Sequence, residues 1–100
     1  MTMMNVVNPR LDDFVGKMRD KLAIPKNQKK GDWRTCTVEE LYEFLDNEMN
    51  ELRKELKLYE PGAKDFKNII SECCDVANFA MMIADKVMQE SQTQEGDRHE

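Results

Sequence analysis

The feature that most constrains this chain is an apolar segment from Ile69 to Met82, with the sequence IISECCDVANFAMM. Its residues are apolar or small except for Ser71, Glu72, Asp75 and Asn78. A helix that is apolar on nearly all sides is a buried helix. No segment of the chain shows the period of two that is typical of strands. We therefore expect a long helix from about Asp65 to Gln89 at the centre of an all-α protein.

A second long helix is expected before this one. Thr37-Val38-Glu39-Glu40 fits a capping box, leucines follow at helical spacing, and Pro61-Gly62 ends the pattern. A shorter helix is expected to begin at Asn8-Pro9, an N-cap followed by proline, and to end at Pro25. The polar residues 25–36 predict a loop. The predicted fold is a helical bundle built on a long antiparallel helix hairpin.

Length and composition fit a single domain. The 100 residues are 40% hydrophobic and 35% charged, which is typical of a globular protein. We expect residues 1–90 to form one helical domain and the polar residues 91–100 to form a disordered tail. Because three helices of this size make a thin core, we also expect a second copy to complete the bundle, as a homodimer or tetramer.

Charge and cysteine content exclude several classes of partner. The 15 basic and 20 acidic side chains give a net charge of −5, so no basic excess is present to bind a nucleic-acid backbone. Charges interrupt each apolar run before it reaches membrane-spanning length, and the N-terminus does not resemble a signal peptide. The three cysteines, two of them adjacent, form neither a disulfide framework nor a spaced zinc pair. We expect a cytoplasmic protein with no membrane or nucleic-acid partner.

Two pairs of acids interrupt the apolar faces of the long helices. Glu48 and Glu51 in the first helix, and Glu72 and Asp75 in the second, are each three residues apart and so share one side of a helix. The pairs are equally far in sequence from Pro61-Gly62, and an antiparallel hairpin turning there brings them face to face. Carboxylates gathered in a groove repel one another unless they protonate or share cations. Oxygen ligands alone favour Mg²⁺, with Mn²⁺ as a possible substitute.

Other interpretations of these acids are open. Glutamates at this spacing are common on exposed helix faces, and buried acids often pair with lysines. A ferritin-like di-iron site is disfavoured because it needs Glu-x-x-His ligands, and the single histidine of the chain is His99 in the predicted tail.

The order of the motifs Glu48-Met-Asn-Glu51 and Glu72-Cys-Cys-Asp75 resembles the paired acids of the MazG-like all-α nucleoside triphosphate pyrophosphohydrolases. The resemblance extends from about Trp33 to Lys86. It implies hydrolysis of a nucleoside triphosphate to a monophosphate and pyrophosphate, with Mg²⁺ on the four acids orienting the attacking water. This family often has a further glutamate where this chain has Asn47, so the number of metal ions and the general base are left open.

Three further residues are candidates for contacts with the substrate. The resemblance implies that Trp33 stacks on a base and that Lys86 meets phosphates, and the amide of Asn78, which can donate and accept, is a candidate to recognise a base edge or sugar hydroxyl. The structural alternatives are an aromatic residue at the edge of the core, a buried amide satisfied by backbone, and a surface lysine. The leading hypothesis is a Mg²⁺-dependent hydrolase. The alternative is a non-catalytic helical module that binds nucleotide, metal or another protein.

Overall fold

The structure, a computed structural model, describes residues 8–24, 32–60, 62 and 66–98, with side chains described up to residue 92. It consists there of helix α1 (Pro9–Ala23), the 3₁₀ turn η2 (Trp33–Thr35), helix α3 (Val38–Lys57) and helix α4 (Lys67–Arg98). No strand is present in these ranges, which confirms the all-α prediction. Pro61, residues 25–31 of the predicted loop, and His99 lie outside the described residues.

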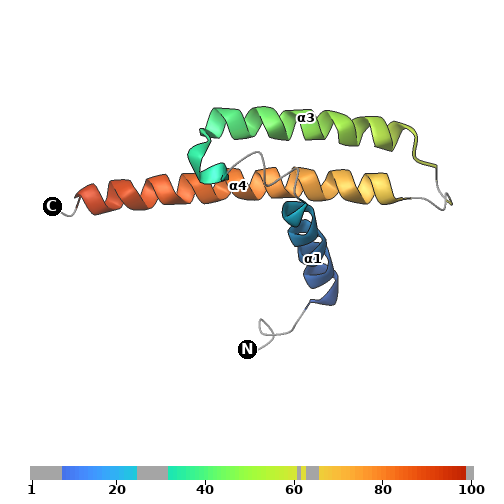
Figure 1. Ribbon diagram of the computed structural model, residues 1–100, viewed down its shortest axis with the longest axis horizontal. Helices are drawn as coiled ribbons and strands as arrows, with labels where there is room; N and C mark the ends of the chain where they lie inside the picture. Colours follow the sequence, from blue (N-terminus) through green and yellow to red (C-terminus); the bar gives the residue numbers. More distant parts are fainter. Residues whose placement is uncertain (1–7, 25–31, 61, 63–65, 99–100) are drawn as a thin grey trace.

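Helix α4 is the element on which the others pack. Helices α3 and α4 lie side by side and run in opposite directions, and α1 meets α4 from another side, near its middle (Figure 1). The turn η2 also packs on α4. The predicted hairpin of two long helices is therefore present, with α4 covered by α3 and by α1.

The predicted helix starts are confirmed by their hydrogen bonds. The Asn8 side chain accepts from the backbone N–H groups of Arg10 and Leu11, and proline occupies the first turn of α1. At α3 the Thr37 hydroxyl accepts from the Glu40 N–H, and the Glu40 carboxylate accepts from the Thr37 N–H. Between α3 and α4, Gly62 has φ of +91°, a conformation that residues with a side chain rarely adopt.

Helix α4 continues beyond the end expected from its apolar pattern. The sequence predicts an end at about Gln89 and a disordered tail from residue 91, whereas the helix runs on to Arg98 and projects past α3 (Figure 1). This segment contains no proline that would end the helix, and the helix extends past the last residues that have an apolar face.

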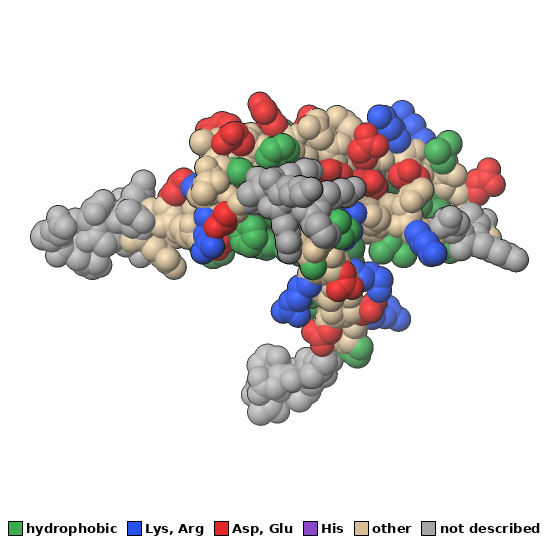
Figure 2. Space-filling model, in the orientation of Figure 1, with side chains coloured by type: hydrophobic (Ala, Val, Ile, Leu, Met, Phe, Trp, Pro, Cys, Tyr) green, Lys and Arg blue, Asp and Glu red, His purple; other side chains and the backbone are tan. Residues whose placement is uncertain are grey.

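The core of the described chain is small, as expected. Its buried hydrophobic side chains are Leu41, Cys74 and Met82, and Phe44 stacks on Phe79 with ring centroids 5.5 Å apart. Many large hydrophobic side chains stay exposed, and some reach the surface along α4 on either side of α1 (Figure 2). None of the described helices combines the length and the apolar character needed to span a membrane.

Candidate functional site

Three of the four predicted acids lie together between α3 and α4. Glu48 of α3 and Glu72 and Asp75 of α4 each offer a carboxylate oxygen, and these oxygens lie within 4.8 Å of one another. All three side chains are half-buried. We call these three residues the acid cluster. The antiparallel packing that the sequence predicts is what brings its two helices together.

Glu51, the fourth predicted acid, lies outside this cluster. Its side chain is 53% exposed, and its Oε1 is 3.3 Å from the Lys54 ammonium on the same helix. Three residues turn a helix by about 300°, which is about 60° short of a full turn, so Glu51 points about 60° away from the direction in which Glu48 faces α4. The same step on α4 keeps Glu72 and Asp75 covered, because α4 has a neighbour on two sides.

Glu72 has the most perturbed carboxyl group of the cluster. Burial, a hydrogen bond shared with the Glu48 carboxyl, and repulsion from Glu48 and Asp75 raise its pKa to about 7, although Lys21 opposes this rise. Among the described residues its buried Oε2 has no hydrogen-bond partner. At neutral pH a substantial fraction of this carboxyl is therefore protonated, as expected for acids that repel one another.

Lys21 of α1 is the cation that contacts the cluster. Its Nζ lies 3.1 Å from the Asp75 carboxylate and donates a 2.7 Å hydrogen bond to the Ser71 hydroxyl. Sequence reasoning did not single out Lys21 or Ser71. A signal was present, since Lys21 follows Phe14 by seven residues and Met18 by three, where helical periodicity predicts an apolar residue. A lysine in that position is a candidate for an ion pair with another element.

Asn78 lies one turn beyond Asp75 and is only 3% exposed. Its Nδ2 donates a 3.1 Å hydrogen bond to the backbone carbonyl of Met18, and its Oδ1 has no partner. The amide nitrogen therefore joins α4 to α1, which is the structural role considered for this residue. Its contact with a substrate stays a prediction.

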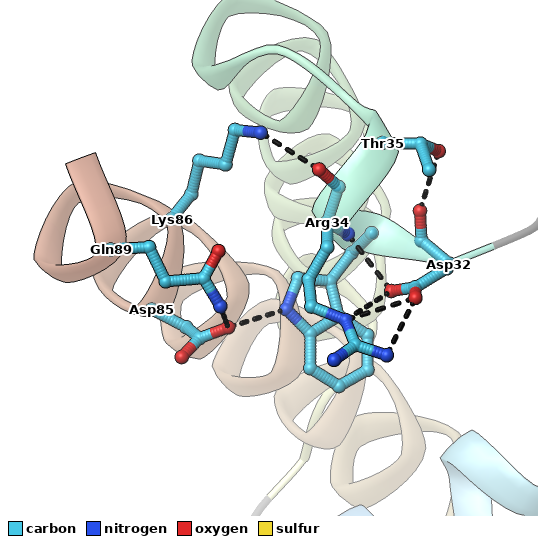
Figure 3. A network of polar contacts seen from close by, with 7 residues as sticks. Asp32, Arg34, Thr35, Asp85, Lys86 and Gln89 are labelled. Carbon is cyan, nitrogen blue, oxygen red and sulfur yellow. Dashed lines mark hydrogen bonds and ion pairs between the residues drawn. The ribbon is translucent and has the colours of Figure 1, made fainter. Parts of the chain in front are cut away.

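Trp33 and Lys86 lie toward the other end of α4, at η2. Trp33 Nε1 donates a 3.0 Å hydrogen bond to the Asp85 carboxylate, and Gln89 donates to the same oxygen at 3.2 Å. Lys86 Nζ donates to the backbone carbonyl of Arg34 at 2.8 Å (Figure 3). Asp85 is about 15 Å along the helix axis from Asp75. The structure thus uses Trp33 and Lys86 to fasten η2 to α4 and does not bring them to the acid cluster.

A shallow hollow of about 330 Å³ lies beside this network. Lys86 lines it together with residues 35–39 and Glu90. Two acids, Glu39 and Glu90, share its wall with the lysine, so its charge does not favour an anion such as a phosphate.

Comparisons with protein-family models, curated proteins and solved structures give no match to this chain. The acid motifs and the geometry of the acid cluster are the features of this chain that point to a function.

Proposed function

We propose that this chain is a Mg²⁺-dependent nucleotide pyrophosphohydrolase of the MazG-like kind, with Mn²⁺ as a possible substitute. The observation that carries the proposal is the acid cluster, in which Glu48, Glu72 and Asp75 converge from two helices. Mg²⁺ binds oxygens at 2.0–2.1 Å, which places neighbouring ligand atoms about 3–4 Å apart. The three carboxylates need only small side-chain movements to reach that spacing, and binding a cation relieves their repulsion.

The chemistry suits a triphosphate substrate. Glu48, Glu72 and Asp75 would hold the metal, which neutralises phosphate oxygens and favours ionisation of a bound water. A carboxylate of the cluster accepts the proton of the attacking water. The water oxygen bonds to the α-phosphorus, and the bond to the bridging oxygen breaks, so that pyrophosphate leaves and a nucleoside monophosphate remains. Glu51, three residues after Glu48 on α3, is the fourth acid of the two motifs.

We also propose that the working form is a homodimer or tetramer in the cytoplasm. Apolar side chains stay exposed toward the hairpin end of α3 and α4, where Tyr59 and Phe66 form a ring pair 5.7 Å apart and Leu58 is 78% exposed. Burying such a surface against a second copy is favourable at about 25 cal/mol per Å². Sedimentation equilibrium tests this, and a monomer at micromolar concentration would contradict it.

The first test of the function has two parts. Thermal unfolding is followed with chelator and with millimolar Mg²⁺ at constant ionic strength, because a ligand of the folded state raises the melting temperature. Pyrophosphate release is then measured with a panel of ribo- and deoxyribonucleoside triphosphates. We expect a rise of several degrees and Mg²⁺-dependent release with at least one substrate. The Asp75→Asn variant, matched in shape, should show neither.

The alternative is a non-catalytic helical module that binds nucleotide or metal, or another protein. Asn47, at the position where the MazG-like enzymes often carry an acid, favours this alternative. It predicts that Mg²⁺ and a nucleotide raise the melting temperature while no triphosphate is hydrolysed.

A further inference from the structure

Helix α1 is joined to the acid cluster by a charged contact. The Lys21 ammonium lies 3.1 Å from Asp75 Oδ2, and the two side chains are 21% and 19% exposed. The Ser71 hydroxyl accepts a second hydrogen bond from the same ammonium at 2.7 Å. A lysine that is held this closely by two groups on α4 acts as a fixed positive charge beside the cluster.

Polar contacts add to the apolar packing of α1 on α4. No residue of α1 is fully buried, and Leu11 stays 58% exposed, whereas Phe14 and Met18 are half-buried. A second polar contact, from Asn78 Nδ2 to the Met18 carbonyl, lies one turn before Lys21. The polar contacts therefore contribute, together with the apolar ones, to the free energy that holds α1 against α4.

We propose that Lys21 is a built-in counter-cation of the acid cluster and that a divalent cation bound there displaces it from Asp75, so that α1 loosens from α4. This inference rests on the proposed metal site. A metal ion at about 2.1 Å from either carboxylate oxygen of Asp75 would lie close to the ammonium that Oδ2 holds, and the two cations would repel one another. Metal and ammonium therefore compete for one carboxylate.

The competition couples metal binding at the acid cluster to the docking of α1 on α4, and the two are measured separately. If a docked α1 weakens metal binding by some factor, then bound metal weakens the docking of α1 by the same factor. The chain would thus respond to a divalent cation by exposing the face of α4 that α1 covers. For an enzyme, this makes the acid cluster accessible when the metal is present.

The test compares Mn²⁺ binding by isothermal titration calorimetry in the whole chain and two variants. Lys21→Met removes the competing charge, and we expect it to bind Mn²⁺ about tenfold more tightly, within the usual range of coupling between sites. Lys17→Met is the matched control, because Lys17 is one turn earlier on α1 and pairs with Asp13 instead of the cluster. It should bind Mn²⁺ as the wild type does.

A second measurement follows α1 itself. Hydrogen exchange of the α1 amides should become faster when Mn²⁺ is added to the wild type, whereas in Lys21→Met it should be fast with and without metal. Lys21→Arg keeps the charge and should restore the wild-type affinity and exchange. This variant separates the effect of the charge from any effect on folding, which far-UV circular dichroism monitors in each case.

The possible failures are distinguishable. Wild-type binding of Mn²⁺ that Asp75→Asn abolishes, together with an unchanged affinity in Lys21→Met, overturns the counter-cation role and leaves the metal site standing. Protection of α1 that is unchanged by Mn²⁺ overturns it as well. Absence of Mn²⁺ binding in the wild type and in Lys21→Met overturns both this inference and the proposed function.

Discussion

Two regions of α4 use the same kinds of side chain in opposite ways. Near the middle of the helix, the Asp85 carboxylate accepts hydrogen bonds from Trp33 and Gln89, and Lys86 donates to a backbone carbonyl. Toward its N-terminal end, Glu72 and Asp75 face a third acid, Glu48. One oxygen of Glu72 is buried without a partner, and the pKa of this carboxyl is raised to about 7.

This difference separates a structural network from a candidate site. Around Asp85 the acceptor has matching donors, so the network stabilises the position of η2 and has little left with which to bind a ligand. In the acid cluster, three carboxyl groups face the one ammonium group that contacts them among the described residues, and the excess negative charge is a cost to the folded chain. A buried polar group without a partner calls for an explanation, and a functional site is one. The acid cluster is therefore the candidate site, and the Asp85 network supports η2.

The largest expected effect is on turnover, and it distinguishes Asp75 of the acid cluster from Asp85 of the network at η2. Asp75→Asn should lower Mg²⁺-dependent pyrophosphate release by roughly 100-fold or more, because a lost ligand misplaces the reacting groups. Asp85→Asn makes the same chemical change in the network at η2 and should leave turnover close to the wild-type value. Release rates at saturating Mg²⁺ measure both. Equal losses of turnover in the two variants would contradict the assignment of a catalytic role to the acid cluster and a structural role to the Asp85 network.

The next effect is a pH dependence that originates at Glu72. Because its pKa is raised from 4.5 to about 7 in the folded chain, the native state binds this proton more tightly than the unfolded state does. The resulting stabilisation is complete below the unfolded value and is lost as the pH rises through about 7. Glu72→Gln mimics the protonated group and should remove this contribution.

In chelator, the melting temperature of the wild type should therefore fall between about pH 5.5 and pH 8 by roughly 5 °C more than that of Glu72→Gln. One pKa unit corresponds to about 1.4 kcal/mol, and solvent screening at a half-buried group reduces this energy. Calorimetric melting curves at several pH values give the difference. If the melting temperatures of the two proteins change with pH in parallel, the pKa of Glu72 is not raised in the metal-free chain.

In the network around Asp85 we expect that a substitution lowers the stability of the folded chain. Asp85→Ala leaves the Trp33 and Gln89 donors without their shared acceptor, which costs about 1–2 kcal/mol for partly buried groups. The melting temperature should fall by about 4–8 °C for each kcal/mol. Urea unfolding measures the free energy, and Lys17→Ala, which removes an exposed ion pair on α1, serves as the surface control. A loss of unfolding free energy no greater than that of the control would contradict a structural role for this network.

The smallest effect is expected at Glu51. Its exposed carboxylate pairs with Lys54 and lies outside the acid cluster, so Glu51→Gln should reduce turnover by less than about fivefold, the range of an exposed charge. The kinetic comparison is with Glu48→Gln, the same change one turn earlier on α3, which should be as damaging as Asp75→Asn. A loss at Glu51 as large as at Glu48 would place all four acids in the working site.

Sequence reasoning predicted the features that depend on local signals. The N-caps at Asn8 and Thr37 and the two long helices follow from spacing alone, and the convergence of Glu48 with Glu72 and Asp75 follows from the antiparallel hairpin. The separation of Glu51 from that cluster depends on how much of the surface of each helix is covered by neighbouring helices. That property is set by packing, because α4 has two neighbours and the step from Glu48 to Glu51 turns away from α4.

The contacts that sequence reasoning missed join distant parts of the chain. The position of Lys21 beside Asp75, and the pairing of Trp33 with Asp85, depend on where α1 and η2 dock along α4. Periodicity gives the face that a helix buries but neither the height nor the angle at which another element crosses it. The helical segment beyond Gln89 was missed for another reason, since a helix without an apolar face leaves no pattern to detect.

The role of α4 as the common support has a consequence for synthesis of the chain. The bonds from α1 and η2 to α4 join residues 50, 52 and 60 positions apart, and α4 is the last described helix. During translation, α1, η2 and α3 leave the ribosome before their packing partner exists. Their apolar faces stay uncovered until α4 has been synthesised, so their packing is completed only after α4 has left the ribosome. A chain truncated before Ile69 would have no support on which to assemble.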